Sequence, residues 1–287
     1  MKADEVQRVA VVGSGVMGSG IAEVCARAGL DVIVLETTVE LLSKGRERIE
    51  RSTEAAVERG RLDAGERQAA LLRVVGTTRL EELAAADLVL EAATEDVAIK
   101  RELFARLDAV MRDDVVFGSN TSSIPIGTLG AATTRPDRVV GMHWFNPVPV
   151  MGLVEIVPAL TTSEETVAFA RAFGERMGKR TVLSGDRAGF IVNTLLIPYL
   201  NDAIRMLEER FATADDIDTA VHLGLNHPMG PLRLADLIGL DTCLNIAEVL
   251  YEEFRDPKFA PPPVLRRMVT AGRLGKKTGS GFYDDYR

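Results

Sequence analysis

The sequence predicts an α/β fold followed by an all-helical region. Its first half alternates short β-branched runs with long charged segments in which apolar residues recur at three and four positions. Such alternation is typical of βαβ units, in which a parallel sheet carries helices on both faces. After about residue 186 the β-branched runs stop and helical periodicity continues alone. A composition of 46% hydrophobic and 26% charged residues over 287 positions is that of a globular protein.

Five runs are expected to form strands and three segments to form helices in the first half. The strand runs are nearly continuous in apolar residues, as strands buried on both faces of a parallel sheet are. The expected strands are Arg8–Val12, Val32–Leu35, Leu88–Glu91, Val115–Phe117 and Val139–Trp144, and the expected helices are Gly18–Ala28, Val39–Arg59 and Val97–Met111. No convincing strand is found from Ile191 to Val269. Turn chemistry at Asp186 and Gly189 places a boundary there, which predicts a first domain of residues 1–187 and a helical second domain of 188–287.

Composition excludes several classes of protein. A net charge of −8 argues against a nucleic-acid partner. No apolar run approaches the roughly 20 residues that a bilayer-spanning helix needs, and the acidic start of the chain does not resemble a signal peptide. Cys25 and Cys243 are too few for a disulfide framework and lack metal-ligand spacing. These features predict a cytoplasmic protein with neither a membrane partner nor a metal site.

A glycine-rich hexad predicts a dinucleotide site. Gly13-Ser14-Gly15-Val16-Met17-Gly18 fits G-x-G-x-x-G, follows the run Val9–Val12 directly and opens a helical segment. Glycine serves there for a tight turn, for close approach to a pyrophosphate and for packing of the helix on the strand. Backbone N–H groups at the helix start bind anions without any basic side chain. This context indicates a Rossmann-type domain with cofactor contacts at Gly13, Gly15, Val16, Met17 and Gly18.

The acid that this motif requires is Glu36, 18 residues after Gly18 and directly after the second expected strand. A carboxylate there accepts hydrogen bonds from the ribose hydroxyls and repels a 2′-phosphate, so NAD is favoured over NADP. No Arg or Lys follows until Lys44, which supports the same choice. The alternative is a solvated turn acid.

A histidine and a carboxylate form a candidate catalytic pair. His143 lies at the end of the last strand expected in the first sheet, where open α/β folds bind ligands. Glu155 interrupts the apolar run LVEIV, and an acid in a buried strand is costly unless it is paired. A carboxylate can fix the tautomer of an imidazole that then exchanges a proton with substrate. The alternative is a buried strand histidine with a satisfied ring.

Five further motifs carry a family resemblance: SNTSSIPI (119–126), HWFNPVPVMGLVE (143–155), GFIVN (189–193), HPMGPLRLADLIGLD (227–241) and GKKTGSGFY (275–283). In this order they resemble the 3-hydroxyacyl-CoA dehydrogenases, most closely the bacterial 3-hydroxybutyryl-CoA dehydrogenases. The resemblance covers essentially the whole chain. It implies a dinucleotide-binding domain, a helical domain through which two subunits form a homodimer, and a place in fatty acid or butanoate metabolism.

The resemblance also implies roles for individual residues. The family's catalytic histidine and acid correspond to His143 and Glu155, and its substrate-binding hydroxyl and amide correspond to Ser122 and Asn193. Because Asn193 lies beyond the expected boundary, the reactive site is expected in an interdomain cleft. Further cofactor contacts are implied at Glu95, Lys100 and Asn120.

The acyl-CoA contacts are expected on the arginine-rich segment 40–61. In the family the corresponding helix helps to hold CoA, which points to Ser43, Lys44 and Arg48. The alternative is an exposed helix with internal pairs such as Glu47–Arg51, four residues apart. The family's lysines are replaced by arginines here, and Thr194 stands where many members have arginine.

The leading hypothesis is therefore an NAD-dependent enzyme that interconverts a short-chain (S)-3-hydroxyacyl-CoA and the 3-oxoacyl-CoA. An enzyme of the same chemistry acting on a carrier-protein-bound, branched or dicarboxylic acyl group, or on a free hydroxy acid, is the nearest alternative. A non-catalytic NAD-binding protein is a third, and it would be expected to lack Ser122, His143, Glu155 or Asn193, all of which are present.

Overall fold

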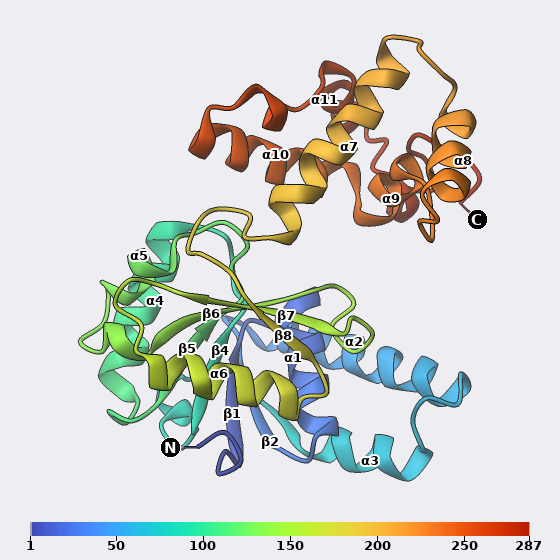
Figure 1. The fold of residues 1–287 in the computed structure, drawn as a ribbon. Coiled ribbons are helices and arrows are strands. Elements are labelled where there is room, and N and C mark those ends of the chain that lie inside the picture. The colour runs from blue at the N-terminus through green and yellow to red at the C-terminus, as the bar shows by residue number, and fades with distance from the viewer. Residues whose placement is uncertain (1, 287) are drawn as a thin grey trace. The chain divides into compact units, whose positions relative to one another are not determined.

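The computed structural model describes residues 2–286 and contains two compact units that divide between Arg187 and Ala188. The first unit is a mostly parallel sheet with helices on both faces, and the second consists of helices and turns (Figure 1). The predicted fold class, a Rossmann-type domain followed by an all-helical one, is confirmed.

The sheet of the first unit has eight strands among the described residues, in the order β3-β2-β1-β4-β5-β6-β7-β8. Strands β1 to β6 run parallel to one another, whereas β7 is antiparallel to β6 and β8 is parallel to β7. The strands are β1 Arg8–Val12, β2 Asp31–Leu35, β3 Val74–Thr77, β4 Leu88–Glu91, β5 Val116–Ser119, β6 Val139–Trp144, β7 Leu153–Pro158 and β8 Arg180–Leu183.

Two strands at the edges of the sheet were not expected from the sequence. Strand β3 is half exposed along its length, and β8 has exposed residues at both ends. An edge strand packs against a neighbour on one side only, so it lacks the continuous apolar run that marks a central strand. Hydrophobic pattern alone therefore does not identify β3 or β8.

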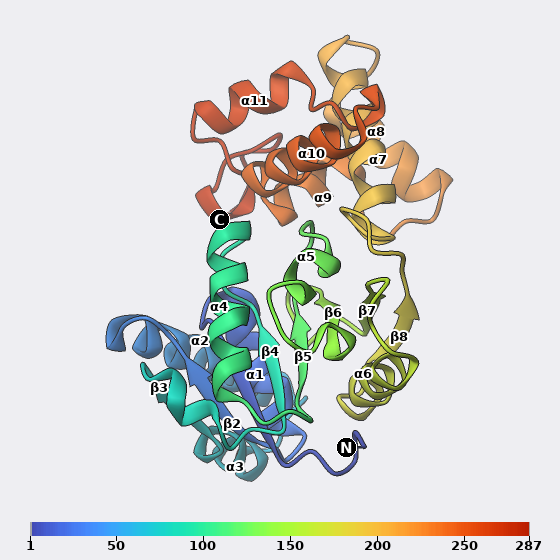
Figure 2. The same cartoon turned by 90° about the vertical axis from the view of Figure 1, so that its left-hand side faces the viewer.

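In the described part of the first unit, six α-helices cover the two faces of this sheet. They are α1 Val16–Arg27, α2 Val39–Glu58, α3 Ala64–Leu72, α4 Val97–Val110, α5 Ile126–Gly130 and α6 Glu164–Arg176. Helices α1 and α6 share one apolar core with alternate residues of the central strands. Helix α4 lies on the opposite face (Figure 2). There Phe104 meets Phe117 of β5 edge to face, with ring centroids 6.0 Å apart.

Strand alternation decides which side chains face α4. In β4 and β5, Leu88, Leu90 and Val116 belong to the core shared with α1 and α6. The residues between them must point to the other face, because successive strand side chains alternate. The same argument applies to β6 and β7, where Met142, Trp144, Val154 and Ile156 belong to the shared core. Four polar residues therefore face the α4 side: Glu91, Ser119, His143 and Glu155.

The second unit contains α7 Val192–Glu208, α8 Ala214–Gly224, α9 Pro231–Ile238, α10 Leu240–Phe254 and α11 Pro263–Thr270. Apolar faces of these helices form two cores. Asp236 is fully buried and accepts hydrogen bonds from the backbone N–H groups of Phe282 and Tyr283 at 2.9 and 3.0 Å. Its role is thus structural, since it holds the C-terminal segment against α9.

Within residues 2–286 no helix is long and apolar enough to cross a bilayer. The same part of the chain holds no cluster of three or more residues suited to a metal ion. Cys25 and Cys243 are both buried free thiols.

Candidate active site

The candidate site lies where the central parallel strands end. Strand β1 pairs with β2 on one side and with β4 on the other, so the chain order reverses beside β1. In open α/β sheets ligands bind outside the carboxyl ends of the strands at such a switch point. The segments that follow β1, β2, β4, β5 and β6 contain most of the residues that the sequence singled out.

The loop after β1 has the backbone geometry that the glycine hexad predicts. Gly13 has a φ of +96°, a conformation that side chains disfavour, and a Cβ there would lie 2.7 Å from the carbonyl oxygen of Ala92. A Cβ on Gly18 would lie 1.9 Å from the carbonyl oxygen of Gly13. At Gly15, by contrast, no heavy atom lies within 4 Å of the Cβ position. Gly13 and Gly18 therefore allow the loop to pack tightly against the backbone. Gly15 leaves the outer surface of the loop accessible to a ligand.

Glu36 directly follows β2 and reaches the glycine loop. Its Oε1 accepts the backbone N–H of Ser14 at 2.8 Å, and its Oε2 accepts the N–H of Thr37 at 2.9 Å. These bonds fix the carboxylate beside the loop, as required of an acid that binds the ribose of a dinucleotide. It is the position that the spacing from Gly18 predicts.

The histidine and the carboxylate proposed as a pair are in contact. His143 and Glu155 are directly opposed in the antiparallel β6–β7 ladder. The His143 Nδ1 and the Glu155 Oε2 are 2.7 Å apart, and the two side chains are 8% and 0% exposed. A carboxylate on Nδ1 favours the tautomer that carries its proton there, which places the proton-accepting lone pair on Nε2. The pair can thus exchange a proton at Nε2 and stabilise the imidazolium that results.

A second buried carboxylate, Glu91 at the end of β4, holds a lysine of α4. The Glu91 Oε1 accepts from Lys100 Nζ at 2.6 Å and from the N–H of Ala93 at 2.7 Å. Its Oε2 accepts the hydroxyl of Ser119 at 2.6 Å. Lys100 is 1% exposed and Glu91 is fully buried. Every close polar contact of this carboxylate is therefore a donor, as a buried charge requires.

This buried pair continues into the loop that carries Ser122. Lys100 Nζ lies 3.6 Å from the Glu95 carboxylate. Glu95 accepts the hydroxyl of Thr121 at 2.9 Å and the backbone N–H of Ser122 at 2.7 Å. One network of ion pairs and hydrogen bonds thus joins the ends of β4 and β5 and sets the position of Ser122.

Asn120 ties the same loop to the strand of the histidine. Its side-chain oxygen accepts the backbone N–H of Trp144 at 2.9 Å. Asn193 lies in the first turn of α7, in the second unit, and is buried. The substrate and cofactor roles of Asn120, Ser122 and Asn193 stay predictions.

Sequence reasoning missed Glu91, Ser119 and Thr121. The signal for Glu91 was available, because an acid ends the apolar run LVLE and Lys100 follows nine residues later. Helical spacing places Lys100 on the face of α4 that also buries Phe104 and Leu107. A buried lysine on an apolar helix face implies a buried acid opposite.

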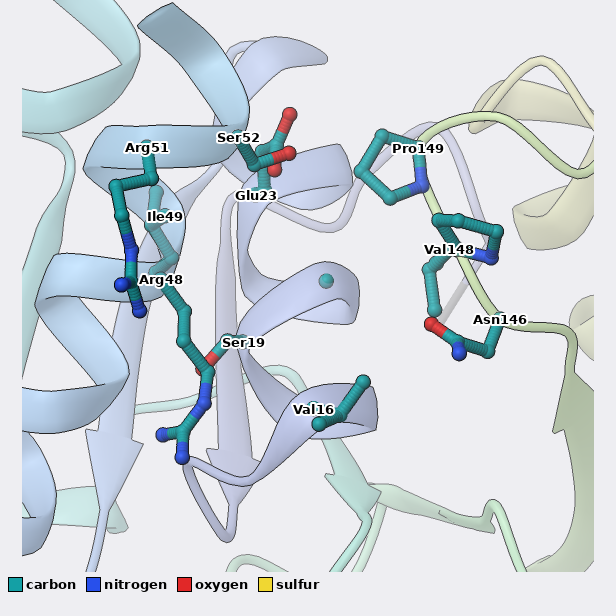
Figure 3. A pocket seen from close by; sticks show the side chains of 12 residues that line it. Val16, Ser19, Glu23, Arg48, Ile49, Arg51, Ser52, Asn146, Val148 and Pro149 are labelled. Atoms are coloured by element: carbon teal, nitrogen blue, oxygen red, sulfur yellow. The ribbon is translucent and has the colours of Figure 1, made fainter. Parts of the chain in front are cut away.

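The residues expected to contact CoA do not line a single cavity. Arg48 lines a cavity of about 320 Å³ with Val16 and Ser52, facing Asn146 and Pro149 (Figure 3). Its guanidinium also donates to the carbonyl of Ser14 at 3.2 Å. Ser43 lines a different cavity of about 280 Å³, against Val74 and Gly76, and Lys44 is exposed. Among the described residues, the i,i+4 ion pair on α2 is Arg46–Glu50 at 2.8 Å and not Glu47–Arg51.

The residues at the switch point fit NAD. Helix α1 begins after Gly15, which has no side chain to cap it, so the N–H groups of its first turn face the open side of the loop. Glu36 stands beside the glycine loop, where the motif expects a ribose acceptor, and Glu95 and Lys100 lie after β4 on the other side of β1. Together with the His143–Glu155 pair, these features define a dinucleotide-dependent dehydrogenase.

Comparison with known proteins assigns the chain within this class. Residues 8–187 match the NAD binding domain of 3-hydroxyacyl-CoA dehydrogenase, and residues 189–285 match the C-terminal domain of the same enzyme. The chain belongs to the 3-hydroxyacyl-CoA dehydrogenase family and is an NAD-dependent oxidoreductase. The predicted family, enzyme class and cofactor are confirmed.

Individual relatives cover nearly the whole chain. The 3-hydroxybutyryl-CoA dehydrogenase of Mycobacterium tuberculosis is 55% identical over 282 residues, which are 98% of this chain and 99% of that protein. The human mitochondrial hydroxyacyl-coenzyme A dehydrogenase is 41% identical over 285 residues, covering 97% and 91%. The crystal structure of M. tuberculosis FadB2 superposes with a TM-score of 0.95 at 55% identity, covering 97% and 98%. The crystal structure of (S)-3-hydroxybutyryl-CoA dehydrogenase PaaH1 from Ralstonia eutropha superposes with a TM-score of 0.91 at 43% identity. The match covers 97% of this chain and 99% of that one.

Two glycines of the loop should respond differently to alanine. Gly15→Ala should leave the fold intact, because its φ of −62° suits alanine and no atom crowds the new methyl group. The methyl group would stand where a pyrophosphate must approach, so the Kd for NADH should rise about tenfold. Gly18→Ala should instead lower the thermal midpoint of unfolding, since its Cβ would meet Gly13. Fluorescence titration and calorimetry measure both effects, and wild-type NADH affinity in Gly15→Ala would contradict the assignment.

The Glu91–Lys100 pair should show strong coupling in a double-mutant cycle. Glu91→Gln leaves a buried ammonium without its closest partner and should cost about 3 kcal/mol of unfolding free energy. Lys100→Met should also destabilise, because it leaves the buried carboxylate with only neutral donors. The double variant Glu91→Gln/Lys100→Met removes both charges. It should lose clearly less unfolding free energy than the two single variants lose together. Urea unfolding measures the cycle, and additive losses would show that the two groups do not interact.

Proposed function

We propose that the protein interconverts a short-chain (S)-3-hydroxyacyl-CoA, in particular 3-hydroxybutyryl-CoA, and the corresponding 3-oxoacyl-CoA. The observation that carries this proposal is the buried His143–Glu155 pair, with 2.7 Å between Nδ1 and Oε2. It lies at the carboxyl end of the parallel strands, where the glycine loop also lies. Support for the substrate comes from two of the relatives named above, the M. tuberculosis and Ralstonia eutropha proteins, which are named 3-hydroxybutyryl-CoA dehydrogenases.

In this proposal His143 moves the substrate proton. Oxidation of a secondary alcohol requires loss of the hydroxyl proton while the hydridic hydrogen leaves carbon. Neutral His143 accepts that proton at Nε2 in oxidation and returns it in reduction. Glu155 stabilises the imidazolium in between and holds the ring in one orientation. When bound, NAD accepts the hydride in oxidation and NADH supplies it in reduction.

Ser122 and Asn193 are proposed to bind the oxygens of the acyl group. A hydroxyl and an amide both donate hydrogen bonds to an oxygen on which negative charge develops. Support for Ser122 comes from the network below it, because Glu95 accepts both its N–H and, at 3.2 Å, its hydroxyl. The backbone bond to Glu95 keeps the loop in place, so only the hydroxyl rotates away from Glu95 to donate its single hydrogen to the substrate oxygen.

Glu36 is proposed to select NAD. Its carboxylate lies beside the glycine loop and would repel a 2′-phosphate on the adenosine ribose.

The free thiols of Cys25 and Cys243 support a reducing compartment, and we place the enzyme in the cytoplasm on that ground.

A homodimer formed through the helical unit is also proposed. Of the large apolar side chains that are exposed in this unit, three belong to α8 or flank it: Phe211 at 76%, Leu223 at 72% and Leu225 at 62%. They lie at the two ends of α8 and its flanking turns. Exposed apolar side chains of this kind mark protein interfaces. In a twofold-symmetric dimer the interface would bury each of them in both subunits.

Steady-state assays test the enzymatic proposal. The highest kcat/KM is expected for acetoacetyl-CoA among C4 to C10 3-oxoacyl-CoA substrates, with NADH preferred over NADPH because of Glu36. His143→Gln should lower kcat by about 10²-fold or more, since the general base is lost, and should leave the Kd for NADH unchanged.

A free 3-hydroxy acid and a carrier-protein-bound substrate complete the comparison. Turnover of either in place of acetoacetyl-CoA would redirect the substrate assignment. Activity with NADPH only, or near wild-type turnover in His143→Gln, would contradict the cofactor and catalytic assignments respectively.

The dimer is tested by charge at its proposed contact. Phe211→Asp/Leu223→Asp should convert a dimer into a monomer of about half the mass, because two desolvated carboxylates per subunit oppose association. Leu72→Asp is the matched control, since Leu72 is 72% exposed in the first unit. Light scattering after size-exclusion chromatography measures the mass. A wild-type monomer, or an unchanged dimer in the double variant, would refute the proposal.

A further inference from the structure

The turn of residues 147–151 connects the two strands of the catalytic pair, β6 with His143 and β7 with Glu155. The last register pair of the β6–β7 ladder is Trp144 opposite Val154. Within the turn, the N–H groups of residues 150 and 151 both donate to the carbonyl of Pro147 at 2.9 Å. These bonds give the turn its shape, and contacts from other elements decide where it lies in the unit.

Lys179, which directly precedes β8, supplies two of these contacts. Its Nζ donates to the carbonyl of Val148 at 2.7 Å and to that of Met151 at 2.8 Å. Lys179 is only 9% exposed. The N–H of the next residue, Arg180, donates to the carbonyl of Gly152 at 2.7 Å. The start of β8 is therefore bonded to both sides of the turn.

The turn packs against α1 at Gly20. A Cβ on Gly20 would lie 2.9 Å from the Cβ of Val148 and 3.0 Å from its Cγ2, so any larger residue would push the turn away. Val148 is 2% exposed and shares a core with Ile21 and Val24 of α1. The helix that starts at the glycine loop is thus in direct contact with the turn that Lys179 holds.

Charged groups of α1 also act on Lys179. Burial lowers the pKa of the Lys179 ammonium below its usual range, and the positive charge of Arg27 lowers it further. The carboxylate of Glu23 acts in the opposite direction. Both residues belong to α1, so Lys179 interacts with this helix as well as with the turn.

The proposed reaction depends on the distance between these two parts of the first unit. The base is carried by β6, whereas the pyrophosphate site is the N-terminal end of α1. Proton and hydride leave adjacent atoms of one substrate, so the base and the cofactor must approach it together. A displacement of about 1 Å can slow such a step by up to about 10²-fold.

We propose that Lys179 is a positioning residue of the reaction, because it holds the turn of residues 147–151 against Gly20 and so fixes His143 relative to the cofactor helix. The inference rests on the proposed function and adds to it a residue that acts only through the turn. Val148 makes the contact with α1, and the two carbonyl bonds of Lys179 keep it there.

Single-turnover kinetics test this role. The enzyme is mixed with NADH and then with saturating acetoacetyl-CoA, and the loss of NADH fluorescence is followed. Lys179→Met keeps the length of the side chain and removes its donors, so the rate constant should fall about tenfold. The Kd for NADH should stay within about twofold of wild type, since the glycine loop is untouched. A role in folding alone would lower the amplitude, which counts active sites, and would leave the rate constant unchanged.

Two further variants separate position from stability. Lys179→Arg keeps donors for both carbonyls, and the cavity of about 370 Å³ beside Lys179 has room for the larger group, so most of the rate should return. Gly20→Ala leaves Lys179 intact and displaces Val148, so it should lower the rate constant in the same way.

Lys2→Met is the matched control, because Lys2 is exposed and precedes β1, at the opposite end of the strand from the glycine loop. It should keep the wild-type rate constant. An unchanged rate constant in Lys179→Met or in Gly20→Ala would overturn the inference and leave the proposed function standing. Failure of the wild-type enzyme to oxidise NADH with acetoacetyl-CoA would instead refute the proposed function.

Discussion

The site depends on one geometric constraint, which combines the shared carboxyl edge of parallel strands with the alternation of their side chains. The shared edge places the segments after β1, β2, β4, β5 and β6 next to one another. Because side chains alternate between the two faces along each strand, Glu91, Ser119 and His143 point to the face of α4. The core that contains α1 and α6 lies on the other face. The reversal of direction at β7 adds Glu155 opposite His143 in the same ladder. Four polar side chains thus lie on one face of strands β4 to β7.

That arrangement concentrates buried charge, which is stable only because each charged group has a partner within hydrogen-bond distance. Glu91 has three donors within 2.7 Å, and Glu155 has the imidazole of His143. The cost of desolvating these groups is large, so their positions cannot relax without losing a bond. Lys100 in turn holds the carboxylate of Glu95, and Glu95 fixes the N–H of Ser122. Catalytic groups held by such contacts are preorganised, which is the main way in which a protein stabilises a developing charge.

Much of this could be predicted from the sequence because it depends on local pattern. The glycine hexad and the spacing to Glu36 describe a turn and a strand length, and the structure has both as expected. The central strands were identified by continuous apolar runs, whereas β3 and β8 were missed because edge strands do not need such runs. The contact of His143 with Glu155 required the register of β6 against β7, which no local pattern specifies. Glu91 was overlooked for a related reason, since its partners Lys100 and Ser119 come from two other elements.

The acidic character of the chain is compatible with anionic ligands because electrostatic interactions in water are local. At physiological ionic strength exposed charges are screened beyond about 8 Å, so carboxylates elsewhere on the surface have little effect on a ligand. What matters is the wall of the cavity itself. At the glycine loop that wall is backbone N–H with no side chain on Gly15. Net charge therefore argues against a polyanion such as nucleic acid, which needs a broad basic surface, and is compatible with a dinucleotide that needs only one loop.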